Sequence, residues 1–187
     1  MKKILIVFIV LLSSCKGTQE NILFDQKLEM CQKARVDNRI NIFGAPKDSI
    51  FHYMNFLSGF ENGLVLHGFL NKIDRKSYKN LFLELKQEKI KKSIIKKLET
   101  GKGLEKDIVH CIVEDLGCLV LLVDINKLVD KNDFRYKMLR LGEEIGNKQE
   151  YNSLIDMLID QIPEREFKKI EYRRIVIRLV YFKLHFE

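Results

Sequence analysis

Tryptophan is missing from the sequence, and proline occurs only twice in 187 residues. β-Sandwiches and β-barrels join many short strands through turns, which such a proline-poor chain supplies poorly. Leucine, isoleucine, lysine and glutamate are abundant instead, and most of these are good helix formers. We therefore expect an all-α fold, a single helical bundle of about six or seven helices.

Motifs with a known catalytic mechanism are also missing. The chain has no Walker A loop, no G-x-S-x-G elbow, no H-E-x-x-H helix and no EF-hand loop. His110 and Glu114 lie one helical turn apart, but a zinc site needs three or four ligands and no others follow at a matching spacing. The sequence thus predicts no catalytic residue, no metal site and no cofactor, and we expect that the protein is not an enzyme.

The first fourteen residues have the composition of a secretory signal. Two lysines follow Met1, residues 4–12 are uniformly apolar, and two serines precede Cys15. Nine apolar residues rise about 14 Å in a helix. This is less than half of the roughly 30 Å hydrocarbon core, so the segment is too short to span a bilayer.

The residues Leu12-Ser13-Ser14-Cys15 resemble the lipobox of bacterial lipoproteins. The resemblance implies cleavage before Cys15, a diacylglycerol on its thiol, and anchoring to a membrane. Two or more acyl chains make such anchoring stable, since each buried methylene contributes about 0.8 kcal/mol. The chain then divides into a signal peptide (1–14), a lipidated cysteine with its tether (15–20) and a helical domain (21–187).

The lysine-, isoleucine-, leucine- and asparagine-rich composition is similar to that of helical surface lipoproteins of spirochaetes. This resemblance implies a non-enzymatic binding or host-interaction protein on the cell surface. Lys16 stands where well-studied inner-membrane lipoproteins carry aspartate, which favours the outer membrane or the cell surface over the inner membrane. Two alternatives stay open: an immunity or assembly lipoprotein that faces the periplasm, and a hydrolase with an unrecognised site.

Positive charge is concentrated in residues 72–106, which hold 12 Lys or Arg and 5 Asp or Glu, a net of +7 that equals the charge of the whole chain. Helical spacing predicts one long helix from Asp74 or Ser77 to about Glu99, with its lysines outward. The predicted basic face consists of Lys86, Lys89, Lys91, Lys92, Lys96 and Lys97. This face is either a solvated surface or a site for an acidic protein, a glycan or an anionic lipid surface. No nucleic acid is expected for an exported chain.

Apolar periodicity predicts the other helices. Phe24, Leu28 and Cys31 indicate a first helix that ends near Val36. The most apolar stretch, 108–128, is expected to form a central buried helix, with a buried strand as the alternative. The last segment, 164–186, contains many β-branched residues, yet its length without a breaker favours a helix over a strand.

Three cysteines remain besides Cys15: Cys31, Cys111 and Cys118. An exported protein can form disulfides, and an odd number leaves at least one thiol free or paired between molecules. In one continuous helix Cys111 and Cys118 are about 10.5 Å apart along the axis, beyond the roughly 7 Å limit for a bridge. A bridge between these two needs a break of the helix at Gly117. A bridge from Cys31 to either of them, and three buried thiols without a bridge, stay open beside it, as does the oligomeric state.

Replacement of Cys15 by alanine (Cys15→Ala) is expected to abolish both palmitate labelling and partitioning into detergent, because alanine has no thiol to carry lipid. Metabolic labelling and detergent phase separation measure the two properties. Cys111→Ala is the control and is expected to behave like the wild type. Equal labelling of the Cys15→Ala variant and the wild type would exclude a lipid anchor at this position.

Overall fold

The computed structural model describes residues 21–35, 38, 53–100, 113–147 and 152–186. In these ranges the chain forms nine α-helices, eight of them seven or more residues long, and one short π-helix, with no strand. The expected all-α fold class is confirmed. The expected number of six or seven helices is too low.

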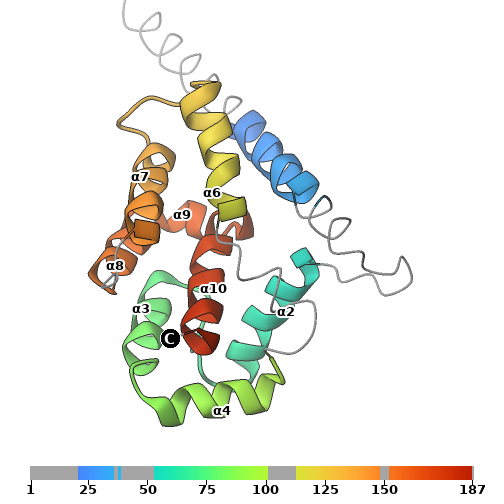
Figure 1. Cartoon of the computed structure of the whole chain (residues 1–187), viewed down its shortest axis with the longest axis vertical. Helices are drawn as coiled ribbons and strands as arrows, with labels where there is room; N and C mark the ends of the chain where they lie inside the picture. Colours follow the sequence, from blue (N-terminus) through green and yellow to red (C-terminus); the bar gives the residue numbers. More distant parts are fainter. Residues whose placement is uncertain (1–20, 36–37, 39–52, 101–112, 148–151, 187) are drawn as a thin grey trace, which may run out of the picture.

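The elements follow one another along the chain as shown in Figure 1. The first is a helix over residues 21–35, and its predicted end near Val36 lies outside the described residues. The others are α2 (Tyr53–Leu66), α3 (Arg75–Glu84), α4 (Glu88–Leu98), α6 (Val113–Leu119), the π-helix η1 (Val120–Ile125), α7 (Phe134–Asn147), α8 (Asn152–Gln161), α9 (Glu164–Phe167) and α10 (Ile170–His185).

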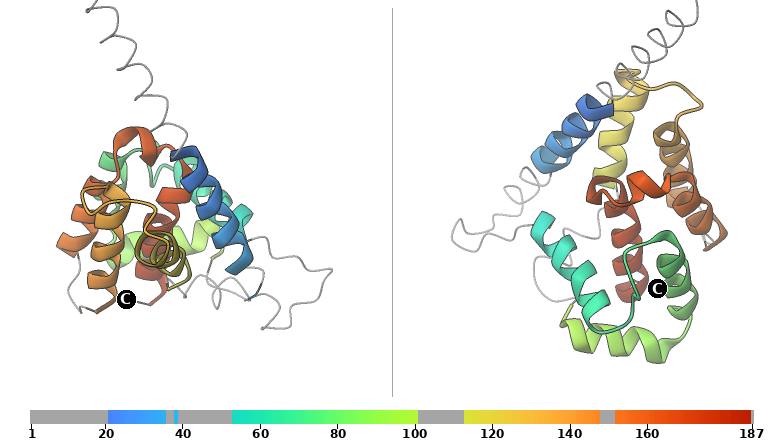
Figure 2. Two further views of the ribbon diagram at one scale, coloured as in Figure 1. Left: turned by 90° about the horizontal axis from the view of Figure 1, so that it is seen from above. Right: turned by 180° about the vertical axis from the view of Figure 1, so that it is seen from behind.

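The last helix, α10, lies in the middle of the molecule, with the other helices around it (Figures 1 and 2). It contacts α2, α6 and α9, and twelve of its 16 residues are buried. The run Ile175-Val176-Ile177 favours a strand by intrinsic propensity, but burial on several sides of a helix outweighs this small preference. The prediction of a helix in this segment is confirmed.

The long helix predicted from Asp74 to Glu99 is instead two helices. Asp74 caps α3, since its side chain accepts a hydrogen bond from the Ser77 backbone N–H at 2.8 Å. The chain leaves helical geometry at Gln87, whose backbone is extended, while Leu85 just before it is fully buried. Leu85 is buried at the corner between α3 and α4, and α4 then crosses the end of the molecule that is lowest in Figure 1.

The prediction of a helix and not a strand in residues 108–128 is confirmed for residues 113–125, but the expected central, buried position is wrong. The described part, from residue 113, consists of α6 and η1, and residues 108–112 lie outside the described residues. Because α10 occupies the centre, only one side of α6 and η1 is buried, through Cys118, Leu119, Leu122 and Val123. Leu121 and Ile125 are exposed.

A buried ion pair joins α10 to α2. The Arg173 guanidinium donates from Nε to Glu61 Oε1 at 2.7 Å and from Nη2 to Glu61 Oε2 at 2.8 Å. The Tyr78 hydroxyl on α3 donates to the same carboxylate at 2.5 Å, and Arg173 Nη1 donates to the Phe167 carbonyl at 2.7 Å. The buried pair of Glu61 and Arg173 thus holds together groups from α2, α3, α9 and α10.

The protonation states of these groups suit the hydrogen bonds. Burial, and then the negative charge of Glu61, raises the pKa of the Tyr78 hydroxyl well above its usual value, so the phenol keeps its proton and donates. Burial acts to lower the pKa of the Arg173 guanidinium. The hydrogen bonds that Arg173 donates to Glu61, together with the negative charge of Glu61, outweigh burial and raise that pKa. A charged, doubly hydrogen-bonded pair is therefore the stable form.

The substitution Arg173→Met is expected to lower the free energy of unfolding by about 3–5 kcal/mol, because it leaves the Glu61 carboxylate buried without its cation. Denaturant unfolding followed by circular dichroism measures the change. The matched control is Lys79→Met, which removes a partly exposed pair with Asp160 and is expected to cost less than about 1 kcal/mol. Equal losses in the two variants would contradict a structural role for the buried pair.

A disulfide joins Cys31 in the helix over residues 21–35 to Cys118 in α6, with a Cα–Cα distance of 5.8 Å. This distance lies within the usual range for a disulfide. The structure therefore has one of the bridges that the sequence left open. Cys111 lies outside the described residues.

Loss of this bridge through Cys118→Ala is expected to lower the free energy of unfolding by about 2–4 kcal/mol, because the bridge restricts the unfolded chain over a separation of 87 residues. Peptide mapping without reductant is expected to recover a peptide that links Cys31 to Cys118. Recovery of both cysteines as free thiols from protein purified without reductant would contradict the pairing.

Candidate basic interface on helix α4

Five of the six lysines predicted to form a basic face are exposed. They are Lys86, in the turn before α4, and Lys89, Lys92, Lys96 and Lys97 on α4. Steps of three and four residues place Lys89, Lys92 and Lys96 on one side of the helix, opposite the fully buried Ile94. We call these three residues the α4 lysine stripe.

Lys97 lies at the edge of the stripe and has a contact of its own. Its Nζ is 5.5 Å from the centroid of the Phe69 ring, within the range of a cation–π interaction. Lys96 and Lys97 also occupy the last turn of α4, where positive charge interacts favourably with the helix dipole. These two lysines therefore stabilise the helix in addition to charging its surface.

Lys91 was predicted to lie on the basic face, and this is wrong. The residue is only 8% exposed, and its Nζ is 3.1 Å from Glu88 Oε1. Lys91 precedes Ile95 by four residues and Leu98 by seven, so it belongs to the side of α4 that packs on the core. The sequence already shows this spacing, but the prediction for Lys91 followed the charge of its side chain instead.

The buried side of α4 faces the end of α10, where Lys183 is 5% exposed. Burial, followed by the positive charges of Lys91 and Lys86, lowers the pKa of the Lys183 amine. Lys183 was missed by the sequence analysis because it lies more than 80 residues beyond the lysines of α4. Only the fold brings these lysines together.

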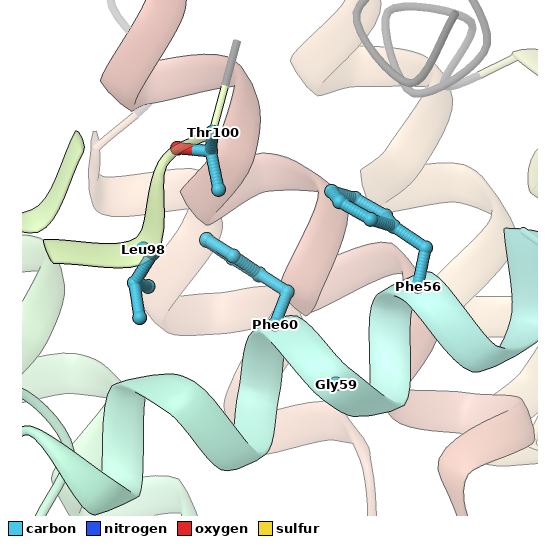
Figure 3. A pocket seen from close by; sticks show the side chains of 5 residues that line it. All are labelled: Phe56, Gly59, Phe60, Leu98 and Thr100. Atoms are coloured by element: carbon cyan, nitrogen blue, oxygen red, sulfur yellow. The ribbon is translucent and has the colours of Figure 1, made fainter. Parts of the chain in front are cut away.

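A small apolar pocket lies beside the end of α4, where α2 passes it (Figure 3). Its volume is about 240 Å³, and its lining consists of Phe56, Gly59, Phe60, Leu98 and Thr100. No titratable side chain is among these lining residues. The pocket offers contact to an apolar group and no means of acid–base catalysis.

The histidines do not form a site in the part of the chain that the structure describes. His67 is exposed, and His185 Nε2 lies 3.0 Å from Thr100 Oγ1. Within the described ranges, no three or more His, Cys, Asp or Glu side chains are grouped so as to bind a metal ion. Cys15 and His110 lie outside these ranges.

Within the same ranges, no helix combines the length and the apolar character needed to cross a bilayer. Comparison with models of protein families, with curated proteins and with solved structures finds no match for this chain. The α4 lysine stripe with Lys86 and Lys97 can attract and hold anions.

Proposed function

We propose that the chain is a bacterial lipoprotein, anchored through Cys15, whose helical domain binds an acidic protein partner through the α4 lysine stripe, Lys86 and Lys97. The domain is a single helical unit on a short lipidated tether. It acts by binding and not by catalysis. It is displayed on the outer membrane or cell surface, where a host or neighbouring protein is the partner.

The main support for this proposal is the position of α4 relative to the start of the first helix. The helix over residues 21–35 begins at the upper end of the molecule in Figure 1, and α4 crosses the lower end, as the view from behind in Figure 2 also shows. The first described helix therefore begins at one end of the molecule, and the lysines lie at the other. This favours a partner beyond the domain over the bilayer on which it is anchored.

Two contacts of α10 indicate how far the first helix lies from α4. Tyr172 donates a hydrogen bond to Asp25 of the first helix, and Lys183 lies near Lys91 of α4. These two positions on α10 are eleven residues apart, about 16 Å along the helix axis. Electrostatic attraction is screened within about 8 Å at physiological salt, so anionic lipid beside the first helix attracts the α4 lysines weakly.

Binding to immobilised polyglutamate tests the proposal, with the full lipidated protein in detergent. The substitutions Lys89→Gln, Lys92→Gln, Lys96→Gln and Lys97→Gln together are expected to weaken binding about tenfold at low salt, since four exposed ion pairs contribute roughly 0.3–0.5 kcal/mol each. High salt is expected to abolish the difference between wild type and variant.

The control removes four other exposed lysines, through Lys33→Gln, Lys76→Gln, Lys137→Gln and Lys168→Gln, and so lowers the net charge equally. It is expected to bind like the wild type. Equal weakening in both variants would show that net charge alone is responsible. Stronger binding to heparin or to anionic vesicles than to polyglutamate would replace the protein partner with a glycan or a lipid surface.

A further inference from the structure

Two elements that carry exposed apolar side chains, η1 and the helix over residues 21–35, reach the upper end of the molecule in Figure 1. Ile125 is 65% exposed at the end of η1, and Leu121 and Leu128 beside it are also exposed. Ile22 and Leu23, both about half exposed, lie in the first turn of the helix over residues 21–35. The views from in front and from behind place both elements at this same end (Figures 1 and 2).

The local backbone accounts for the exposure of η1. The Asn126 N–H bonds to the Leu121 carbonyl, five residues before it, at 3.0 Å, which is the spacing of a π-helix. The Leu128 N–H bonds to the Leu122 carbonyl at 3.0 Å and closes the turn that follows η1. Leu122 and Val123 face the core, so Leu121 and Ile125 face outward. Short π-helices cost backbone stability and occur frequently at functional sites.

The two apolar elements are held together by specific contacts. Arg135, at the start of α7, donates to Asn21 Oδ1 at 2.9 Å and to Asp133 Oδ2 at 2.6 Å. Its guanidinium also lies 4.2 Å from the centroid of the Phe24 ring. The loop that follows η1 is therefore fixed next to the beginning of the first helix.

Basic side chains accompany the apolar ones. Lys127 and Lys131 are exposed in the loop after η1, within a few residues of Ile125 and Leu128. Lys127 has a left-handed backbone, with φ of 49°, a conformation that costs a non-glycine residue some stability. Apolar side chains flanked by lysines suit the boundary between acyl chains and anionic headgroups, where a lysine stem stays apolar and its amine reaches the phosphates.

We propose that this end of the domain is a membrane-contacting surface, in which Leu121, Ile125, Leu128, Ile22 and Leu23 rest on the lipid bilayer and hold the domain upright. The proposal rests on the proposed anchor at Cys15. Cys15 precedes Asn21 by six residues, so even a fully extended tether spans no more than about 21 Å. The proposed anchor at Cys15 thus keeps this end of the domain close to the bilayer. The bilayer is therefore the surface that we expect the exposed apolar side chains to contact.

The other large apolar side chains that are exposed among the described residues are spread over several elements. Leu66, Leu83 and Met157 lie on α2, α3 and α8, Met30 lies farther along the helix over residues 21–35, and Ile73 precedes α3. Isolated exposed apolar residues are common on protein surfaces and need no partner. They provide matched positions for a control.

Since the chain has no tryptophan, a single introduced indole reports on one position. The full lipidated protein is reconstituted in phosphatidylglycerol-containing liposomes with brominated acyl chains, in the variants Leu23→Trp and Ile125→Trp and in the controls Leu66→Trp and Leu83→Trp. For the first two we expect a blue shift of the emission and quenching by the bromine atoms. The controls are expected to emit as in water, without quenching.

The outcomes separate this inference from the proposed function. Flotation with the liposomes that is lost on Cys15→Ala supports the anchor, and absence of flotation overturns both the anchor and the membrane-contacting surface. Flotation without quenching at Leu23→Trp and Ile125→Trp overturns the surface alone. Equal quenching at all four positions shows that the domain lies flat on the bilayer, which overturns the upright orientation.

Discussion

The buried pair of Arg173 and Glu61 is the constraint on which the arrangement of the helices depends. Burying an ion costs several kcal/mol unless a partner and further hydrogen bonds compensate, and α10 brings four basic side chains into the interior, Arg173, Arg174, Arg178 and Lys183. Glu61 of α2 meets Arg173, and Gln32 of the first helix accepts from Arg174. A helix that is buried on many sides by apolar packing alone can rotate about its axis into several positions. Each of these polar contacts is possible in only one rotation of α10.

Aromatic side chains also pack along α10. The Tyr181 ring lies edge-on to Phe56 and Phe60 of α2, at centroid distances of 5.7 and 5.6 Å, and Tyr172 packs against Phe134 of α7 at 5.1 Å. The central helix thereby connects the two ends of the molecule. One end carries the start of the first helix and the exposed side chains of η1, and the other carries α4. This arrangement supports our proposal that a lipid tether holds one end of the domain at a membrane and that the charged surface at the other end faces away from it.

Particular residues show where sequence reasoning succeeded and failed. The spacing of Phe24 and Leu28 predicted the first helix, and both residues are buried in it, because amphipathic spacing directly reflects burial. The turn at Gln87 could not be foreseen, since no proline or glycine marks it and it follows from burying Leu85. Lys91 was assigned outward for its charge, although its spacing relative to Ile95 places it inward. Chemical type and periodicity disagreed there, and periodicity was the better guide.

The sequence by itself determined the helical class, most of the inward-facing positions and the concentration of positive charge, because these depend on composition and on local spacing. The lipobox resemblance is likewise a property of fifteen contiguous residues. Tertiary structure alone decided that α10 is central, that Cys31 pairs with Cys118, and that Glu61 receives Arg173 across 112 residues of sequence. It also decided that the exposed lysines of α4 lie far from the start of the first helix. Such pairings depend on which surfaces meet when the whole chain is packed, and no local pattern encodes them.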